Sequence, residues 1–137
     1  MLAAIKELAY FLAGEPLTAD QIIEQLGKVI QDFGGNVTIQ PRDPFFKTAG
    51  LVRELDPATL KSTNRPALIS LAPTDPLTLK SLAGAFGPYQ QIPAEDRVPP
   101  QVIFYLDLPG RPYTVALIGE VKGNRVVRLM LRRDIRL

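Results

Sequence analysis

The beginning of the chain repeats apolar residues at helical spacing. From residue 2 to residue 12 the apolar positions recur every three or four residues, which is typical of one face of an amphipathic helix. Gly14 followed by Pro16 ends the pattern. We therefore expect a short helix whose buried stripe is Ile5, Leu8, Ala9 and Leu12.

A second helical pattern follows directly. Thr18 can cap a helix and Gln21 can return the hydrogen bond, as in a capping box. The apolar positions continue at helical spacing to Phe33, where the pair Gly34-Gly35 interrupts them. The pattern predicts one helix up to that pair, with the stripe Ile22, Leu26, Val29, Ile30 and Phe33.

Short apolar and alternating runs predict strands in the rest of the first half. The predicted strands cover residues 37–39, 49–55 and 67–71. Between the last two, Asp56 before Pro57 is typical of a helix start, so we expect one helical turn through Lys61.

The second half repeats this order more clearly. Asp75 before Pro76 predicts a helix start, and Gly87 followed by Pro88 predicts its end. The apolar stripe of this helix is Leu79, Leu82, Ala83 and Phe86. Three strand patterns follow at residues 101–108, 113–121 and 126–133, joined by short turns that include the hairpin signal Gly123-Asn124. An antiparallel meander covered by helices, hence an α+β fold, is expected.

The two halves match at a constant offset of 60 residues. Residues 15–18 lie over residues 75–78, both reading acidic-Pro-Leu-Thr, and residues 68–71 lie over residues 128–131. We predict a single domain, residues 1–137, built as a tandem of helix-plus-three-strand halves at 14–73 and 74–137. The alternative is a favourable helix start used twice, because the middle strands align only with gaps.

The unit from Leu77 to Pro88, followed by a three-stranded meander, resembles the repeat of the beta-lactamase-inhibitor-protein-like and SmpA/OmlA-like domains, whose repeats open with a short helix that ends at a Gly near a Pro. The resemblance implies helices on an antiparallel sheet, with a sheet face free for a protein partner. It covers residues 75–133 and the first half more loosely. The chain lacks the cysteines that form the disulfides common in the inhibitor family, so inhibition of a beta-lactamase is not implied and no binding residues are transferred.

Composition narrows the chemistry. The 137 residues are 46% hydrophobic and include no cysteine, histidine or tryptophan, which fits a soluble globular domain without disulfides, thiolate nucleophiles or imidazole chemistry. The acidic pair Glu95-Asp96 lies in a proline-rich loop, and Ser62 and Ser81 each follow a lysine whose side chain should point elsewhere. We predict no catalytic residue, no metal site and no cofactor.

The end of the chain is rich in basic residues, which raises the question of a nucleic-acid partner. Residues 122–136 carry six basic side chains against Asp134 alone, which makes nucleic acid the alternative to test. Strand alternation instead predicts a solvated outer face with Val126, Arg128, Met130 and Arg132.

No apolar run approaches the roughly 20 residues of a membrane span. Lys6-Glu7 interrupts any signal-peptide pattern, so we expect a cytoplasmic protein, with an exported protein whose signal has been removed left open.

The meander is apolar on both faces. One face, the predicted core, holds Val102, Phe104, Leu106, Val115, Leu117, Leu129 and Leu131. The other holds Ile103, Tyr105, Ala116, Ile118 and Met130. Either the first helix or another subunit covers this second face, or it is a partner site bordered by charges.

The favoured function is a non-enzymatic protein-binding module, such as an inhibitor, immunity protein or accessory subunit, whose partner is another protein or a second copy. Its predicted partner-binding residues are Ile103, Tyr105, Ile118, Glu120, Arg128, Met130 and Arg132. The alternative is a small-ligand carrier or cryptic enzyme with a pocket between sheet and helices, which an apolar cavity with converging polar groups would favour.

Overall fold

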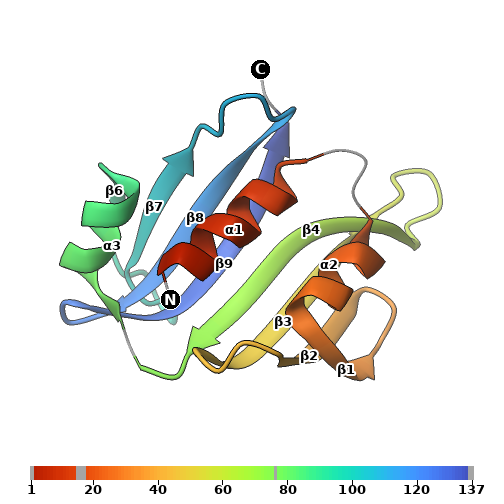
Figure 1. Ribbon diagram of the computed structural model, residues 1–137, viewed down its shortest axis with the longest axis horizontal. Helices are drawn as coiled ribbons and strands as arrows, with labels where there is room; N and C mark the ends of the chain where they lie inside the picture. Colours follow the sequence, from red (N-terminus) through yellow and green to blue (C-terminus); the bar gives the residue numbers. More distant parts are fainter. Residues whose placement is uncertain (1, 15–17, 76, 136–137) are drawn as a thin grey trace.

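In the described part of the chain, three helices pack on one face of an antiparallel sheet, which confirms the α+β class (Figure 1). The computed structural model describes residues 2–14, 18–75 and 77–135. The helices are α1 (Leu2–Leu12), α2 (Ala19–Leu26) and α3 (Leu79–Phe86). The strands are β1 (Gly27–Asp32), β2 (Asn36–Pro41), β3 (Phe46–Leu55), β4 (Ser62–Pro73), β5 (Leu77–Thr78), β6 (Gln90–Ile92), β7 (Gln101–Leu106), β8 (Tyr113–Lys122) and β9 (Arg125–Ile135).

The sheet runs in the order β1-β2-β3-β4-β9-β8-β7-β6, and β5 pairs with β9 beside this path. Its centre is the antiparallel pair β4–β9, where Ile69 lies opposite Leu131 and Leu71 opposite Leu129. In the described part of the chain, each of α2 and α3 is followed by four strands along this path, one more than predicted. None of the described helices is long and apolar enough to cross a membrane.

The core lies between the helices and the sheet. The predicted α1 stripe of Ile5, Leu8, Ala9 and Leu12 is buried there, as is the whole predicted core face of the meander. On α3, Leu82 is fully buried, while Leu79, Ala83 and Phe86 pack against the core in part. The sequence therefore located most of this core correctly.

The second predicted helix is wrong in its second half. α2 ends at Leu26, and residues 27–32 form the edge strand β1 instead. Gly27 adopts φ +156°, and a Cβ there would meet the Gln40 carbonyl oxygen at 2.0 Å, so the turn from helix to strand needs glycine. Val29, Ile30 and Phe33, predicted as a buried stripe, are exposed.

One predicted helix start needs correction. The N-cap of α3 is Thr78, whose side chain accepts from the Ser81 N–H, and it lies three residues after Asp75. Pro76, part of the predicted start, lies outside the described residues. At Asp56 a hydrogen bond from the Leu60 N–H to the Asp56 carbonyl closes a single turn, as predicted, and the turn does not continue into a longer helix.

One residue lies on the unexpected face of a correctly predicted strand. The pairing shifts between Glu120 and Val121 of β8, which leaves Val127 as an extra residue in β9. Val126 is therefore buried in the core rather than on the outer face with Arg128 and Met130.

Candidate functional site

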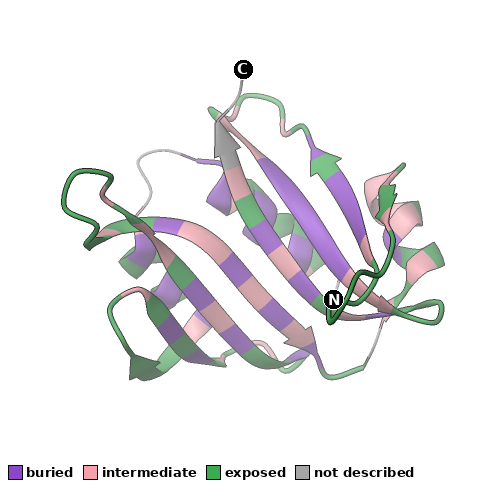
Figure 2. Cartoon of the chain, turned by 180° about the vertical axis from the view of Figure 1, so that it is seen from behind, coloured by how far each residue is buried: buried purple, intermediate pink, exposed green. Residues whose placement is uncertain are grey.

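The face of the sheet opposite the helices is uncovered over most of its width (Figure 2). Register places two rows of residues across this open sheet face. One row is Asn36, Val52, Leu68, Arg132, Ala116 and Tyr105. The next is Thr38, Gly50, Ser70, Met130, Ile118 and Ile103.

The predicted second apolar face exists, but α1 does not cover it. α1 packs in the core on the opposite side, so that alternative is wrong. Ile103, Ala116 and Ile118 form a separate cluster, against which Ile92 and Met130 pack. Ile103 and Ile118 are 9% and 8% exposed, so neighbours on their own sheet already shield them.

The other predicted partner-binding residues remain accessible around this cluster. Tyr105 is 60% exposed, and Arg128 and Arg132 are exposed on β9. Met130 and Glu120 are half-buried, and Glu120 lies directly across from Arg128 in the β8–β9 register. The seven residues thus lie on one continuous part of the open sheet face.

The face extends into the first half of the chain, which holds none of the predicted partner-binding residues. Val52 is exposed and Leu68 half-buried, and they lie side by side in the β3–β4 register. In the next row, Gly50 and Ser70 lie side by side next to Met130. Their side chains are absent or short, so they project less from the sheet than Val52, Leu68 and Met130 do. A Cβ on Gly50 would come within 2.8 Å of the Ser70 hydroxyl, so a larger residue at position 50 would require the Ser70 side chain to move.

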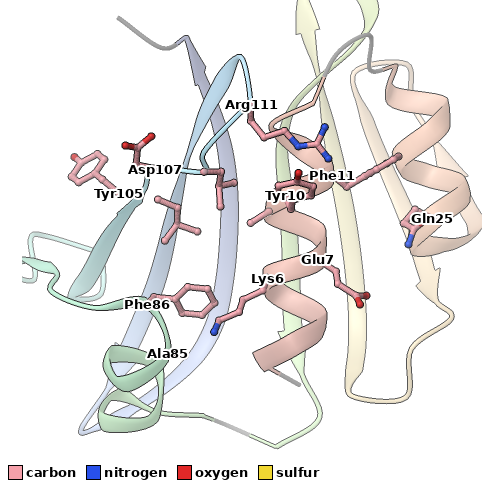
Figure 3. Close-up of a pocket in the computed structure, with 13 residues that line it drawn as sticks. Lys6, Glu7, Tyr10, Phe11, Gln25, Ala85, Phe86, Tyr105, Asp107 and Arg111 are labelled. Atoms are coloured by element: carbon pink, nitrogen blue, oxygen red, sulfur yellow. The ribbon is translucent and has the colours of Figure 1, made fainter.

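A groove of about 720 Å³ lies on the helix side of the sheet, between α1, α3 and the end of β7 (Figure 3). Its apolar lining includes Phe86 from α3 and Leu106 and Leu108 at the end of β7. The volume falls within the range of small-molecule sites. Sequence reasoning missed it because its walls come from segments that are distant along the chain, namely α1, α3, the end of β7 and, through Gln25, α2.

Charged groups stand at both ends of the groove. The Lys6 ammonium lies 5.8 Å from the centre of the Phe86 ring, and the Arg111 guanidinium stacks 3.7 Å above the Tyr10 ring. Glu7, the next residue on α1, points away from Lys6 toward the α2 side (Figure 3). Apolar walls with a few placed polar groups are the arrangement that the alternative hypothesis requires.

The groups weighed for catalysis do not assemble. The Ser81 hydroxyl is 2.7 Å from that of Thr78 in the helix cap, and Glu95 lies in an exposed loop bridge with Val98. Among the described residues no three acidic side chains gather in a way that could hold a metal ion.

Comparisons with known proteins add no relative: no family model, curated protein or solved structure matches the chain. The resemblance to beta-lactamase-inhibitor-protein-like domains therefore stays a prediction.

Proposed function

We propose that the protein is a non-enzymatic protein-binding module, such as an inhibitor, immunity protein or accessory subunit, that contacts another protein through the open sheet face. The observation that carries the proposal is that all three described helices lie on one side of the sheet. The other side presents the exposed Val52 and Tyr105 and the half-buried Met130, and the shielded Ile118 packs beside Met130. Apolar anchors inside a charged rim are typical of protein interfaces.

The charge on this face favours a different protein over a second copy. Arg128 and Arg132 are exposed there, with Glu120 as the acidic neighbour. A face-to-face dimer would place this face against an identical one, so two surfaces that each carry more arginine than carboxylate charge would meet. The partner that fits has an apolar patch flanked by carboxylates.

We also propose that the chain is a tandem of two related halves, residues 14–73 and 74–137. α2 and α3 each have eight residues, start 60 residues apart and are capped by Thr18 and Thr78. Ser70 and Met130, also 60 residues apart, face each other in the β4–β9 register, as equivalent residues on a twofold axis would. Superposing residues 18–72 on 78–132 should match one helix and at least two strands; failure would contradict the tandem.

The binding proposal is tested with two face variants, Val52→Asp and Arg128→Glu. Both side chains are exposed, so the variants should fold, whereas an aspartate at the shielded Ile118 would disturb the sheet itself. Lys80→Glu, exposed on α3, is the matched control. Each protein is immobilised and offered a lysate of the native cells, and captured proteins are quantified.

We expect a captured protein whose amount falls about fivefold or more with both face variants, as the loss of roughly 1 kcal/mol at an interface anchor implies. Lys80→Glu should capture as much as the parent. Equal capture by all four proteins, or none by the parent, would overturn the proposal. Sedimentation of the isolated protein adds a check: a dimer abolished by both face variants would make the occupant a second copy.

A further inference from the structure

We propose that the groove between α1, α3 and the end of β7 binds a small amphipathic anion, an apolar or aromatic molecule that carries one carboxylate or sulfonate. Most of this site is on the helix side of the sheet, and it shares one lining residue, Tyr105, with the open sheet face. The tests below change no residue of the open sheet face, so this proposal and the protein-binding proposal can fail separately.

The shape of the groove follows from the spacing of α1. Lys6 and Tyr10 are four residues apart, so they lie on one face of the helix about 6 Å apart along its axis. At one end of the groove Lys6 extends toward the Phe86 ring. At the other end the Arg111 guanidinium stacks on the Tyr10 ring (Figure 3). An elongated ligand can lie along α1 between these two points.

The walls of the groove are largely apolar, and their contact with water is unfavourable in free energy. Tyr10 is 49% exposed, and the Phe86 ring and the Leu108 side chain are half-buried. Leu106 at the base of the groove is 9% exposed. A ligand that covers these side chains removes apolar surface from water, which contributes roughly 25 cal/mol per Å².

Lys6 gives the site its preference for an anion. Its ammonium contacts the Phe86 ring, and no ion pair joins it to a carboxylate in the part of the chain that the structure describes. Two carboxylates also line the groove, Glu7 and Asp107, but Glu7 is directed away from Lys6 and Asp107 lies beside Tyr105, apart from Lys6 (Figure 3). The exposed Lys6 ammonium therefore lies beside the apolar Phe86 ring with no described carboxylate paired to it, and an incoming anion gains a charge-assisted contact there.

Two fluorescent probes separate the apolar contribution from the charge. 8-Anilinonaphthalene-1-sulfonate is an aromatic anion, and N-phenyl-1-naphthylamine has the same ring system without the sulfonate. We expect saturable one-site binding of the sulfonate to the folded protein and an upward shift of the unfolding midpoint as its concentration rises. Competition by decanoate tests whether an aliphatic carboxylate enters the same site.

The informative variant is Lys6→Met, which keeps most of the side-chain length and removes the charge. It should weaken binding of the sulfonate about fivefold or more and change binding of the neutral probe less than about twofold. Lys80→Met, exposed on α3 outside the groove, is the matched control and should bind both probes like the parent.

A second pair of variants tests the location. Ala85→Trp should fill the groove from α3 and abolish binding of both probes. Tyr10→Ala, at a half-exposed position that the fold should tolerate, should weaken both probes if the tryptophan disturbs α3. Absence of saturable binding, equal sulfonate affinity in Lys6→Met, or undiminished binding in folded Ala85→Trp and Tyr10→Ala would each overturn the proposal. Failure of decanoate to compete would restrict the ligand to aromatic anions and contradict the aliphatic part of the class.

Discussion

At the scale of single residues, two glycines of this chain differ in whether the backbone requires them. Gly27 is required by its conformation and its neighbours, whereas Gly84 could be replaced. Gly27 joins α2 to β1 at φ +156°, with the Gln40 and Arg42 backbones against the place of a Cβ. Gly84 lies inside α3, and apart from its chain neighbours and the backbone of its own helix no heavy atom lies within 4 Å of that place. The two positions therefore respond to alanine in opposite directions.

We predict that Gly27→Ala lowers the free energy of unfolding by about 2 kcal/mol or more, because the backbone of β2 cannot move aside cheaply. Gly84→Ala should raise it by roughly 0.5–1 kcal/mol, since alanine loses less conformational entropy in a helix. Urea unfolding followed by circular dichroism measures both. Equal effects of the two substitutions would contradict this account.

At the scale of elements, one arginine connects α2, the β1–β2 turn and β3. The Arg53 guanidinium lies 3.2 Å from the Asp32 carboxylate and 2.7 Å from the Gly34 carbonyl oxygen, and it forms an ion pair with Asp20 near the start of α2. The Gly34 N–H donates to Asp32 and, with the Arg53 guanidinium, holds the pKa of that carboxyl below its ordinary value, while partial burial opposes the shift.

A carboxyl whose pKa is lower in the folded state stabilises the fold above its unfolded pKa, and this contribution is lost as the pH falls through the folded pKa. We predict that Asp32→Asn lowers the thermal unfolding midpoint at pH 7 and that the difference from the parent narrows toward pH 3. Asp96→Asn, in an exposed loop, is the control and should leave the midpoint nearly unchanged. A difference that stays constant from pH 7 to pH 3 would contradict the prediction.

Elements with a long hydrophobic periodicity that ends at a glycine, a proline or a turn were predicted correctly. An element whose conformation depends on pairing with another strand was not. The α1 stripe and the three meander strands have clear periods and turn residues, and the structure contains them. The segment around Val29 and Ile30 has helical spacing but β-branched residues, and pairing with β2 decided its conformation. The groove was unpredictable because Lys6, Phe86 and Leu106 meet only in the folded chain.

At the scale of the whole molecule, one continuous core connects the two halves of the sheet. Leu51 in β3 and Leu117 in β8 are both buried in the same cluster, and the central pair β4–β9 joins the halves through Ile69 and Leu131. The buried residues of α1 and of the central strands belong to this same cluster, so we expect that neither half keeps its core if the other unfolds. Cooperative unfolding follows from this arrangement.

We therefore predict a single calorimetric transition whose calorimetric and van't Hoff enthalpies agree. Leu117→Ala should lower the free energy of unfolding by about 2–5 kcal/mol and reduce hydrogen-exchange protection in β2 and β3 as well as in β7 and β8. Leu51→Ala provides the reciprocal test, because a cavity in β3 should reduce protection in β7 and β8 by the same mechanism. Protection lost only in the half that carries the substitution would show that the halves unfold separately, and the shared core would then not govern stability.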